Sequence, residues 1–379
     1  MANCRRNRLI DGGNQLGKRQ SLGTKGGERY QKAQGMGDGE GHVRDERFAP
    51  RDRDVFVTVE GWIFTVLGDV HPPKRIWSYL KYVPGAGPWR DASGRTYRRV
   101  FTTYTVREML SIMEDLRTSR PEYVYYDPTV GNEVIAPFVD AITGYWRTSE
   151  GLRRLVEREE SGHATPLELK ALEMVRWLVE QTGLRLEDLG ITGSLLLGIH
   201  HEKSDVDVVV FGQRNLWKVI RELREAGSPV VPGAGESIVE ALRSFYRMPV
   251  EDARRLAARV VHKGLFAGTP YSIFGIRERP LHGYGEFQYT SRGIVEVKLE
   301  IADATESLFT PLIYGVEESV FGIERLVSYH MVLAGLLEPG DRLEVRAKLE
   351  EVKGPRGEFL QLLLGSYEGV GSEQVKLLR

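Results

Sequence analysis

The feature that most restricts the fold of this 379-residue chain is a Gly-Ser pair followed, ten residues later, by an Asp-x-Asp pair. The first pair is Gly193-Ser194, the second is Asp205-Val206-Asp207, and apolar stretches flank both. Because successive side chains of a strand point to opposite faces, Asp205 and Asp207 should share one face and Val206 the other. The pattern therefore predicts two neighbouring strands that place a glycine-serine bend beside two carboxylates.

This arrangement has the chemistry of a phosphate and metal site. Two close carboxylates repel each other unless a cation lies between them, and Mg²⁺ prefers carboxylate and phosphate oxygens. One or two such ions can hold a nucleoside triphosphate and polarise its α-phosphate for attack by a hydroxyl. Gly193 would let a phosphate approach the backbone without a Cβ in the way, and Ser194 offers a hydroxyl and a backbone N–H. A helix that starts here would add a favourable dipole.

An apolar strand, a Gly-Ser pair and a later Asp-x-Asp pair resemble the signature of the nucleotidyltransferase superfamily. This superfamily includes DNA polymerase beta, the CCA-adding enzymes and the aminoglycoside nucleotidyltransferases. The residues that carry the resemblance are Gly193-Ser194 and Ser204-Asp205-Val206-Asp207-Val208. The chain after the first 48 residues is also similar to a group of archaeal proteins described only as predicted nucleotidyltransferases, through the longer Gly-Ser-Leu-Leu-Leu-Gly-Ile-His run and through Glu60-Gly-Trp-Ile-Phe64 and His71-Pro72.

The resemblance implies a mixed-sheet nucleotidyltransferase core. It also implies magnesium-dependent transfer of a nucleoside monophosphate from a nucleoside triphosphate to a hydroxyl, with release of pyrophosphate. In this interpretation Asp205 and Asp207 are catalytic and hold one or two Mg²⁺ ions. Gly193 and Ser194 bind the triphosphate, and Lys203 is a further candidate for a phosphate contact. The acceptor stays open, with RNA and protein as candidates.

The superfamily pattern also contains a third carboxylate on a later strand, and its identity in this chain is open. The predicted strand over residues 271–276 carries no acid. Glu296 is our candidate for the third catalytic residue, with Glu278, Glu300 or no third carboxylate as the alternatives. Glu296 and Glu300 share one face of a predicted strand. They can join the site only if that strand joins the sheet of Asp207, and otherwise they are surface positions.

Composition divides the chain into four segments of an α/β protein, of the α+β multidomain kind. Lys+Arg 52 against Asp+Glu 53 argues against a grossly basic nucleic-acid binder, and the single cysteine excludes a disulfide scaffold. Residues 1–48 are glycine-rich with few apolar residues, which predicts a disordered tail, and Met36 offers an alternative start. We predict an N-terminal α+β domain over 49–150, the nucleotidyltransferase domain over 151–278, and a β-rich, barrel-like domain over 279–379.

Local signals predict several individual elements. Thr165, Pro166 and Glu168 form a capping box with proline at the first helical position, so a helix should run from there to about Thr182. Asn215 should cap a second helix, and a third should cover residues 251–262. Residues 285–290 and 294–301 alternate around a Ser-Arg-Gly turn, which predicts a hairpin.

The alternative to an enzyme is a catalytically inactive nucleic-acid-binding protein on the same fold. Four C-terminal aromatic residues could stack bases, although such residues are more often core: Phe287, Tyr289, Phe309 and Tyr314. A third option is an enzyme that attaches AMP or UMP to a protein. No apolar run reaches the roughly 20 residues of a membrane helix, and the first residues lack a secretory signal. We therefore expect a cytoplasmic protein without a membrane partner, and leave the base and the oligomeric state open.

Overall fold

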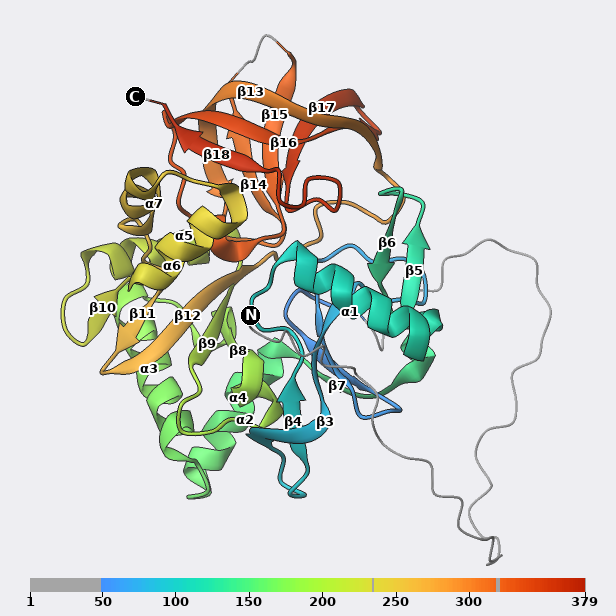
Figure 1. The fold of residues 1–379 in the computed structure, drawn as a ribbon. Coiled ribbons are helices and arrows are strands. Elements are labelled where there is room, and N and C mark those ends of the chain that lie inside the picture. The colour runs from blue at the N-terminus through green and yellow to red at the C-terminus, as the bar shows by residue number, and fades with distance from the viewer. Residues whose placement is uncertain (1–48, 234, 318–320, 379) are drawn as a thin grey trace, which may run out of the picture. The chain divides into compact units, whose positions relative to one another are not determined.

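The N-terminal part is built on a five-stranded antiparallel sheet. The computed structural model describes residues 49–233, 235–317 and 321–378, so the predictions for 1–48 lie outside it. In order β4-β3-β2-β1-β7, the strands of this sheet are β1 (Val55–Thr58), β2 (Ile63–Val66), β3 (Ser78–Arg90), β4 (Thr96–Arg99) and β7 (Ile142–Trp146). Helix α1 (Val106–Ser119) packs its apolar side on one face of the sheet (Figure 1). A separate two-stranded ribbon contains β5 (Val124–Asp127) and β6 (Asn132–Ile135).

A second five-stranded sheet carries the Gly-Ser and Asp-x-Asp residues. In order β10-β11-β12-β9-β8, its strands are β8 (Leu189–Ile191), β9 (Val206–Phe211), β10 (Val230–Pro232), β11 (Lys263–Phe266) and β12 (Thr269–Ile276). The sheet is mixed, because β9 and β12 run parallel and the other pairs are antiparallel. The helices of this part are α2 (Thr148–Glu160), α3 (Pro166–Thr182), α4 (Gly193–Leu197), α5 (Gln213–Glu225), α6 (Gly235–Tyr246) and α7 (Val250–Ala257).

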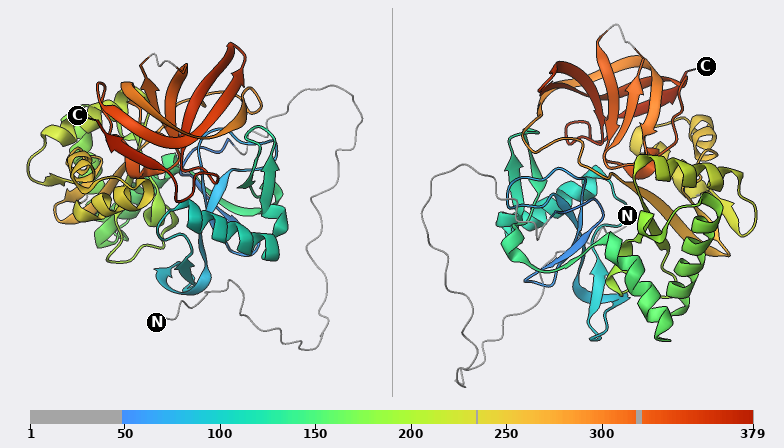
Figure 2. Two further views of the ribbon diagram at one scale, coloured as in Figure 1. Left: turned by 45° about the horizontal axis from the view of Figure 1, so that its top comes forward. Right: turned by 180° about the vertical axis from the view of Figure 1, so that it is seen from behind.

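The C-terminal strands close a circuit of hydrogen-bonded pairs. They are β13 (Gln288–Glu306), β14 (Leu312–Val316), β15 (Ile323–Ser328), β16 (Arg342–Gly354), β17 (Gly357–Leu364) and β18 (Gln374–Leu377). Their order is β13-β14-β15-β17-β16-β18, and β13 also pairs with β16. Figure 2 shows these orange and red strands wrapped around a common interior. The described part of the chain is thus mixed α and β, rich in strands, with seven α-helices.

The strongest local predictions are confirmed. Thr165 Oγ1 accepts from the Glu168 backbone N–H and the Glu168 side chain accepts from the Thr165 backbone, so the predicted capping box opens α3. Gly183 ends α3 with φ +66°, a left-handed conformation that glycine adopts without a steric cost. The expected strands before Gly193 and after Asp205 are β8 and β9, and a helix, α4, does begin at Gly193.

Two helix boundaries are wrong. Helix α5 starts after Gly212, and Asn215 lies inside its first turn, where the side-chain Nδ2 donates to Phe211 O at 2.9 Å. Helix α7 ends at Ala257, and residues 258–262 connect it to β11. Gly264 is therefore a strand residue, and a Cβ there would lie 2.3 Å from the carbonyl oxygen of Val231.

The predicted hairpin around residues 291–293 is also wrong. Residues 288–306 form one long strand, β13, which pairs with β16 from Gln288↔Lys353 to Glu300↔Arg342. The register shifts between Ser291 and Ile294, so the apparent turn is a bulge in this strand. A bulge and a tight turn both favour glycine and small polar residues, and the alternation on either side does not distinguish them.

The division of residues 49–379 into three domains stays a prediction, because residues 50–379 form one compact unit by their contacts. None of the helices in the described ranges is both long enough and apolar enough to cross a membrane.

Candidate active site

The bend at Gly193 lies directly against the carboxylate of Asp207. A Cβ at residue 193 would lie 2.2 Å from Asp207 Oδ2, and Gly193 has φ +69°. The backbone N–H of Thr192 donates to Asp207 O at 3.0 Å, so β8 and β9 bring the two motifs together. The contact requires glycine for two reasons, because any other residue would collide with Asp207 and would strain the backbone.

Strand β9 orients the two carboxylates as the alternation predicts. Val206 and Val208 are buried in the main core, whereas Asp205 and Asp207 line a cavity on the other side. The cavity has a volume of about 900 Å³, and Ser194 and Lys203 also line it. The structure therefore brings together five of the six predicted site residues.

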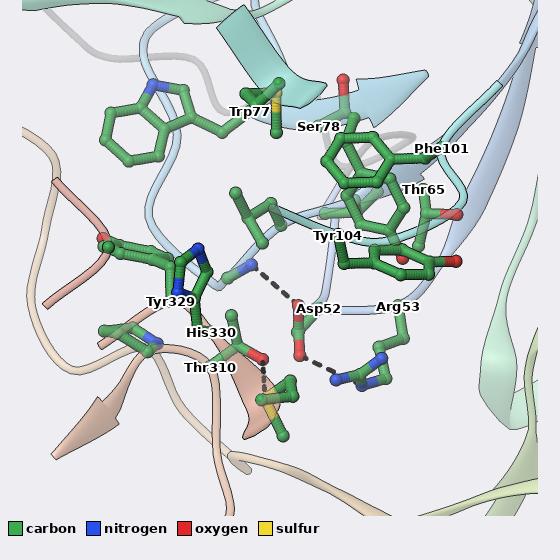
Figure 3. A pocket seen from close by; sticks show the side chains of 18 of the residues that line it. Asp52, Arg53, Thr65, Trp77, Ser78, Phe101, Tyr104, Thr310, Tyr329 and His330 are labelled. Carbon is green, nitrogen blue, oxygen red and sulfur yellow. Dashed lines mark hydrogen bonds and ion pairs between the residues drawn. The ribbon is translucent and has the colours of Figure 1, made fainter. Parts of the chain in front are cut away.

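The N-terminal sheet supplies another part of this cavity. Thr192 Oγ1 donates to the carbonyl oxygen of Arg53 at 2.8 Å, and the ring of Trp89 lies 5.5 Å from that of His201. Figure 3 shows Arg53, Trp77, Phe101 and Tyr104 of the N-terminal part and Tyr329 and His330 of the C-terminal part around the pocket. Residues far apart in the sequence thus enclose the carboxylate pair.

Three basic side chains, Arg53, Lys81 and Lys263, face Asp207, and we call them the basic cluster. Lys81 lies on β3 and is buried, and Lys263 opens β11. Among the described residues, neither lysine has a carboxylate within 4.0 Å. Sequence reasoning missed this cluster. Lys81 is the one member with a local signal, because a lysine alternating with buried apolar residues in a strand is unusual.

The pKa values of the site reflect burial and close charges. Burial and the charge of Asp205 raise the pKa of Asp207 to about 6, although the basic cluster partly offsets this. Burial also lowers the pKa of Lys263, with Arg53 contributing and the two aspartates opposing. Both shifts disfavour the charged form of the side chain, which indicates that neighbouring charges do not fully offset the cost of burial. Such a site is suited to an anionic ligand together with a cation.

The position beside Asp207 holds no third carboxylate. Ser272 of β12 pairs with Asp207, and Lys263 of β11 pairs with Ser272, so the three side chains share one face of the sheet. No group of three or more His, Cys, Asp or Glu within the described ranges could hold a metal ion. A serine and a lysine, and no acid, therefore continue this row beside Asp207.

The three candidate glutamates lie elsewhere. Glu278 approaches Gly212, just past the end of β9 opposite to Asp207. Glu296 and Glu300 lie on β13, which belongs to the C-terminal sheet and not to the sheet of Asp207. Glu296 pairs with Arg346 at 3.7 Å, and Glu300 with Arg342 at 3.9 Å. The condition for placing Glu296 in the site is therefore not met.

Asp205 and Asp207 are the residues of this cavity that could hold a magnesium ion together with an anionic ligand. Mg²⁺ is commonly held by one or two carboxylates plus substrate phosphates and water. Asp205 and Asp207 supply the two carboxylates, and both line the cavity. The basic cluster opposes a cation when no anion is present. We therefore expect a cation to bind here only together with an anionic ligand.

Asp207→Asn should raise the free energy of unfolding at pH 8, by up to about 3 kcal/mol. The pKa of Asp207 in the folded protein, about 6, exceeds the ordinary aspartate value of 3.8 that applies to the unfolded chain. The folded protein therefore retains the proton to higher pH than the unfolded chain, and wild-type stability falls as pH rises between these values. Denaturant unfolding of both proteins at pH 4 and pH 8 measures this, and the gain should nearly vanish at pH 4. A variant less stable than wild type at pH 8 would show that attraction to the basic cluster outweighs burial.

Comparison with known proteins finds a relative in an archaeon. An uncharacterized protein of Methanocaldococcus jannaschii, MJ1086, is 23% identical over 346 residues, which cover 87% of this chain and 99% of that protein. No protein-family model matches the chain. No solved structure matches it.

Proposed function

We propose that this protein is a magnesium-dependent nucleotidyltransferase. In the proposed reaction a hydroxyl oxygen of the acceptor attacks the α-phosphorus of a nucleoside triphosphate, and the bond between the α- and β-phosphates breaks. Pyrophosphate leaves, and the hydroxyl proton passes to solvent. The sheet of β8 to β12, with α4 after β8, would then be the nucleotidyltransferase core.

The observation that carries the proposal is the contact of Gly193 with the carboxylate of Asp207. If Gly193 were only a turn residue and the two aspartates were only surface residues, this contact would not be required. It supports one shared site, in which a phosphate can reach the Gly193–Ser194 backbone while its oxygens approach Asp205 and Asp207. The basic cluster adds positive charge where a triphosphate would lie.

Each residue has a defined part in the proposed site. Asp205 and Asp207 would hold Mg²⁺, which when bound neutralises phosphate charge and polarises the α-phosphate. Ser194 and Lys203 would contact the phosphates together with the basic cluster. Enclosure by the N-terminal sheet would limit water at the α-phosphate and strengthen these electrostatic interactions. Positioning and charge neutralisation would therefore supply most of the acceleration.

One observation favours the alternative of an inactive nucleic-acid-binding protein. Lys263 stands in the row where the superfamily pattern has a third acid. A two-carboxylate site can still hold a metal with phosphate ligands, so we retain the enzyme as the first proposal.

A thermal-shift experiment separates the two. We expect a nucleoside triphosphate with Mg²⁺ to raise the melting temperature by several degrees, because ligand at 100 times its dissociation constant adds about 2.7 kcal/mol. The four ribonucleotides should each be tested with Mg²⁺ and with EDTA. The double variant Asp205→Asn/Asp207→Asn serves as the matched control. It should lose the magnesium-dependent part of the rise in melting temperature. A shift with RNA and none with any nucleotide would favour the inactive binder.

A further inference from the structure

The C-terminal strands have the connectivity of an oligonucleotide/oligosaccharide-binding fold. The circuit of five strands runs β13-β14-β15-β17-β16 and returns to β13. Its first strand is long and bulged and pairs with both the second and the fourth, while the third and fifth, β15 and β17, are parallel. Folds of this kind bind their ligands on the outer face of the second and third strands, here β14 and β15.

That outer face lines the cavity of the carboxylate pair. Alternate residues of the strands, such as Tyr314, Leu326 and Leu362, form the buried interior. Their neighbours point the opposite way and line the cavity: Ile313, Arg325, Val327, Gln361 and Leu363. Asp205 and Asp207 line the same cavity. A ligand on this face would therefore reach the proposed catalytic residues without leaving the cavity.

The chemistry of the face suits unpaired bases. Phe287, just before β13, and Tyr289 on β13 line the same cavity as half-buried aromatic side chains, whereas Phe309 and Tyr314, also considered from the sequence, are core residues. Tyr329 lies beside them, 6.5 Å from the ring of Trp77 (Figure 3). Unstacked bases bind to such rings with little dependence on sequence.

The charge of the cavity favours a nucleic acid over a peptide. Eight Lys and Arg residues and six Asp and Glu residues line it, although acids slightly outnumber bases in the whole chain. On the outer face, Arg325 lies 4.6 Å from the ring of Phe359 and donates to Gln361 Oε1 at 2.8 Å. Within the described residues Arg325 makes no ion pair, so its charge is left for a phosphate or a base.

We propose that a single-stranded nucleic acid binds on the outer face of β14, β15 and β17, with its 3′-terminal nucleotides in the cavity. This inference rests on the proposed function, in which the terminal hydroxyl of the strand would be the acceptor. The 3′ oxygen forms the new bond to the α-phosphorus, pyrophosphate leaves, and the hydroxyl proton passes to solvent. A cavity of about 900 Å³ is near the upper limit for one small ligand. This volume leaves room for a nucleotide beside the end of a single strand.

The test is equilibrium binding without nucleotide and with EDTA, so that it does not depend on catalysis. The probes are end-labelled single-stranded RNA and DNA of about 12 nucleotides, and fluorescence anisotropy measures their binding. We expect binding that weakens with salt, and roughly tenfold weaker binding for Arg325→Gln and for Tyr289→Leu, the scale of one lost base or phosphate contact. Comparison of the RNA and DNA arms identifies the kind of strand.

Arg346→Gln is the matched control, because Arg346 lies on β16 outside the cavity and pairs with Glu296. Absence of binding to both probes up to about 100 µM would overturn the inference, since even non-specific binding is commonly tighter. Equal affinities of the Arg325→Gln and Arg346→Gln variants would overturn it too. Transfer of a labelled nucleotide to protein without oligonucleotide binding would refute the inference and leave the proposed function standing. Strand binding through this face without any magnesium-dependent nucleotide shift would support the binding site and refute the proposed function.

Discussion

Replacing both Asp205 and Asp207 with asparagine should abolish nucleotide transfer, with a loss of about a thousandfold or more. Asparagine keeps the size of each side chain but removes the negative charge that would hold Mg²⁺ at the phosphates. The measurement is release of pyrophosphate from each nucleoside triphosphate in the presence of the acceptor. The fold should survive, because Asp205 is exposed and neutralising Asp207 relieves a cost of burial.

Glu296→Gln provides the control for this experiment. It changes the same functional group on a strand of the C-terminal sheet, where Glu296 faces Arg346. We expect wild-type turnover from this variant. Full activity in the double aspartate variant would refute the site, and a large loss in Glu296→Gln would restore that residue as the third carboxylate.

Gly193→Ala should reduce transfer by about a hundredfold or more, because a misplacement of about 1 Å in an active site can have this effect. The new Cβ would lie 2.2 Å from Asp207 Oδ2, so either the bend or the carboxylate must move. Alanine at φ +69° also costs about 1–2 kcal/mol of stability. Initial rates and denaturant unfolding of the same preparations measure the two effects.

Gly198→Ala separates the clash from the backbone strain. Gly198 ends α4 with φ +68°, and a Cβ there meets nothing within 4 Å. It should therefore show the loss of stability with near-normal transfer. Equal losses of activity in both variants would mean that backbone strain, and not the contact with Asp207, explains the effect of Gly193→Ala.

The sequence was informative where a structure depends on neighbouring residues. The capping box of Thr165 and Glu168 is local, and so is the alternation that orients Asp205 and Asp207. The bulge near Ser291 was misread because its pairing partner, β16, lies about 60 residues later along the chain. Only that pairing distinguishes one bent strand from two short ones.

The missing part of the candidate site is non-local for the same reason. Arg53, Lys81 and Lys263 lie more than 50 residues from Asp207, and no spacing rule connects them to it. The sequence predicts an acid on a later strand from residue type alone. The sheet order instead places Ser272 and Lys263 beside Asp207. The order of the strands in the sheet determines which side chains lie beside Asp207. The residue pattern within one strand does not reveal that order.

The basic cluster also has a consequence for the end of a catalytic cycle. The side chains that would attract an incoming triphosphate would hold the departing diphosphate product with nearly the same strength, inside a site walled by a second sheet. Escape of that product, and not bond rearrangement, would then limit the rate of repeated cycles. In an enzyme of this design, a first round would be fast and later rounds would wait for the anion to leave.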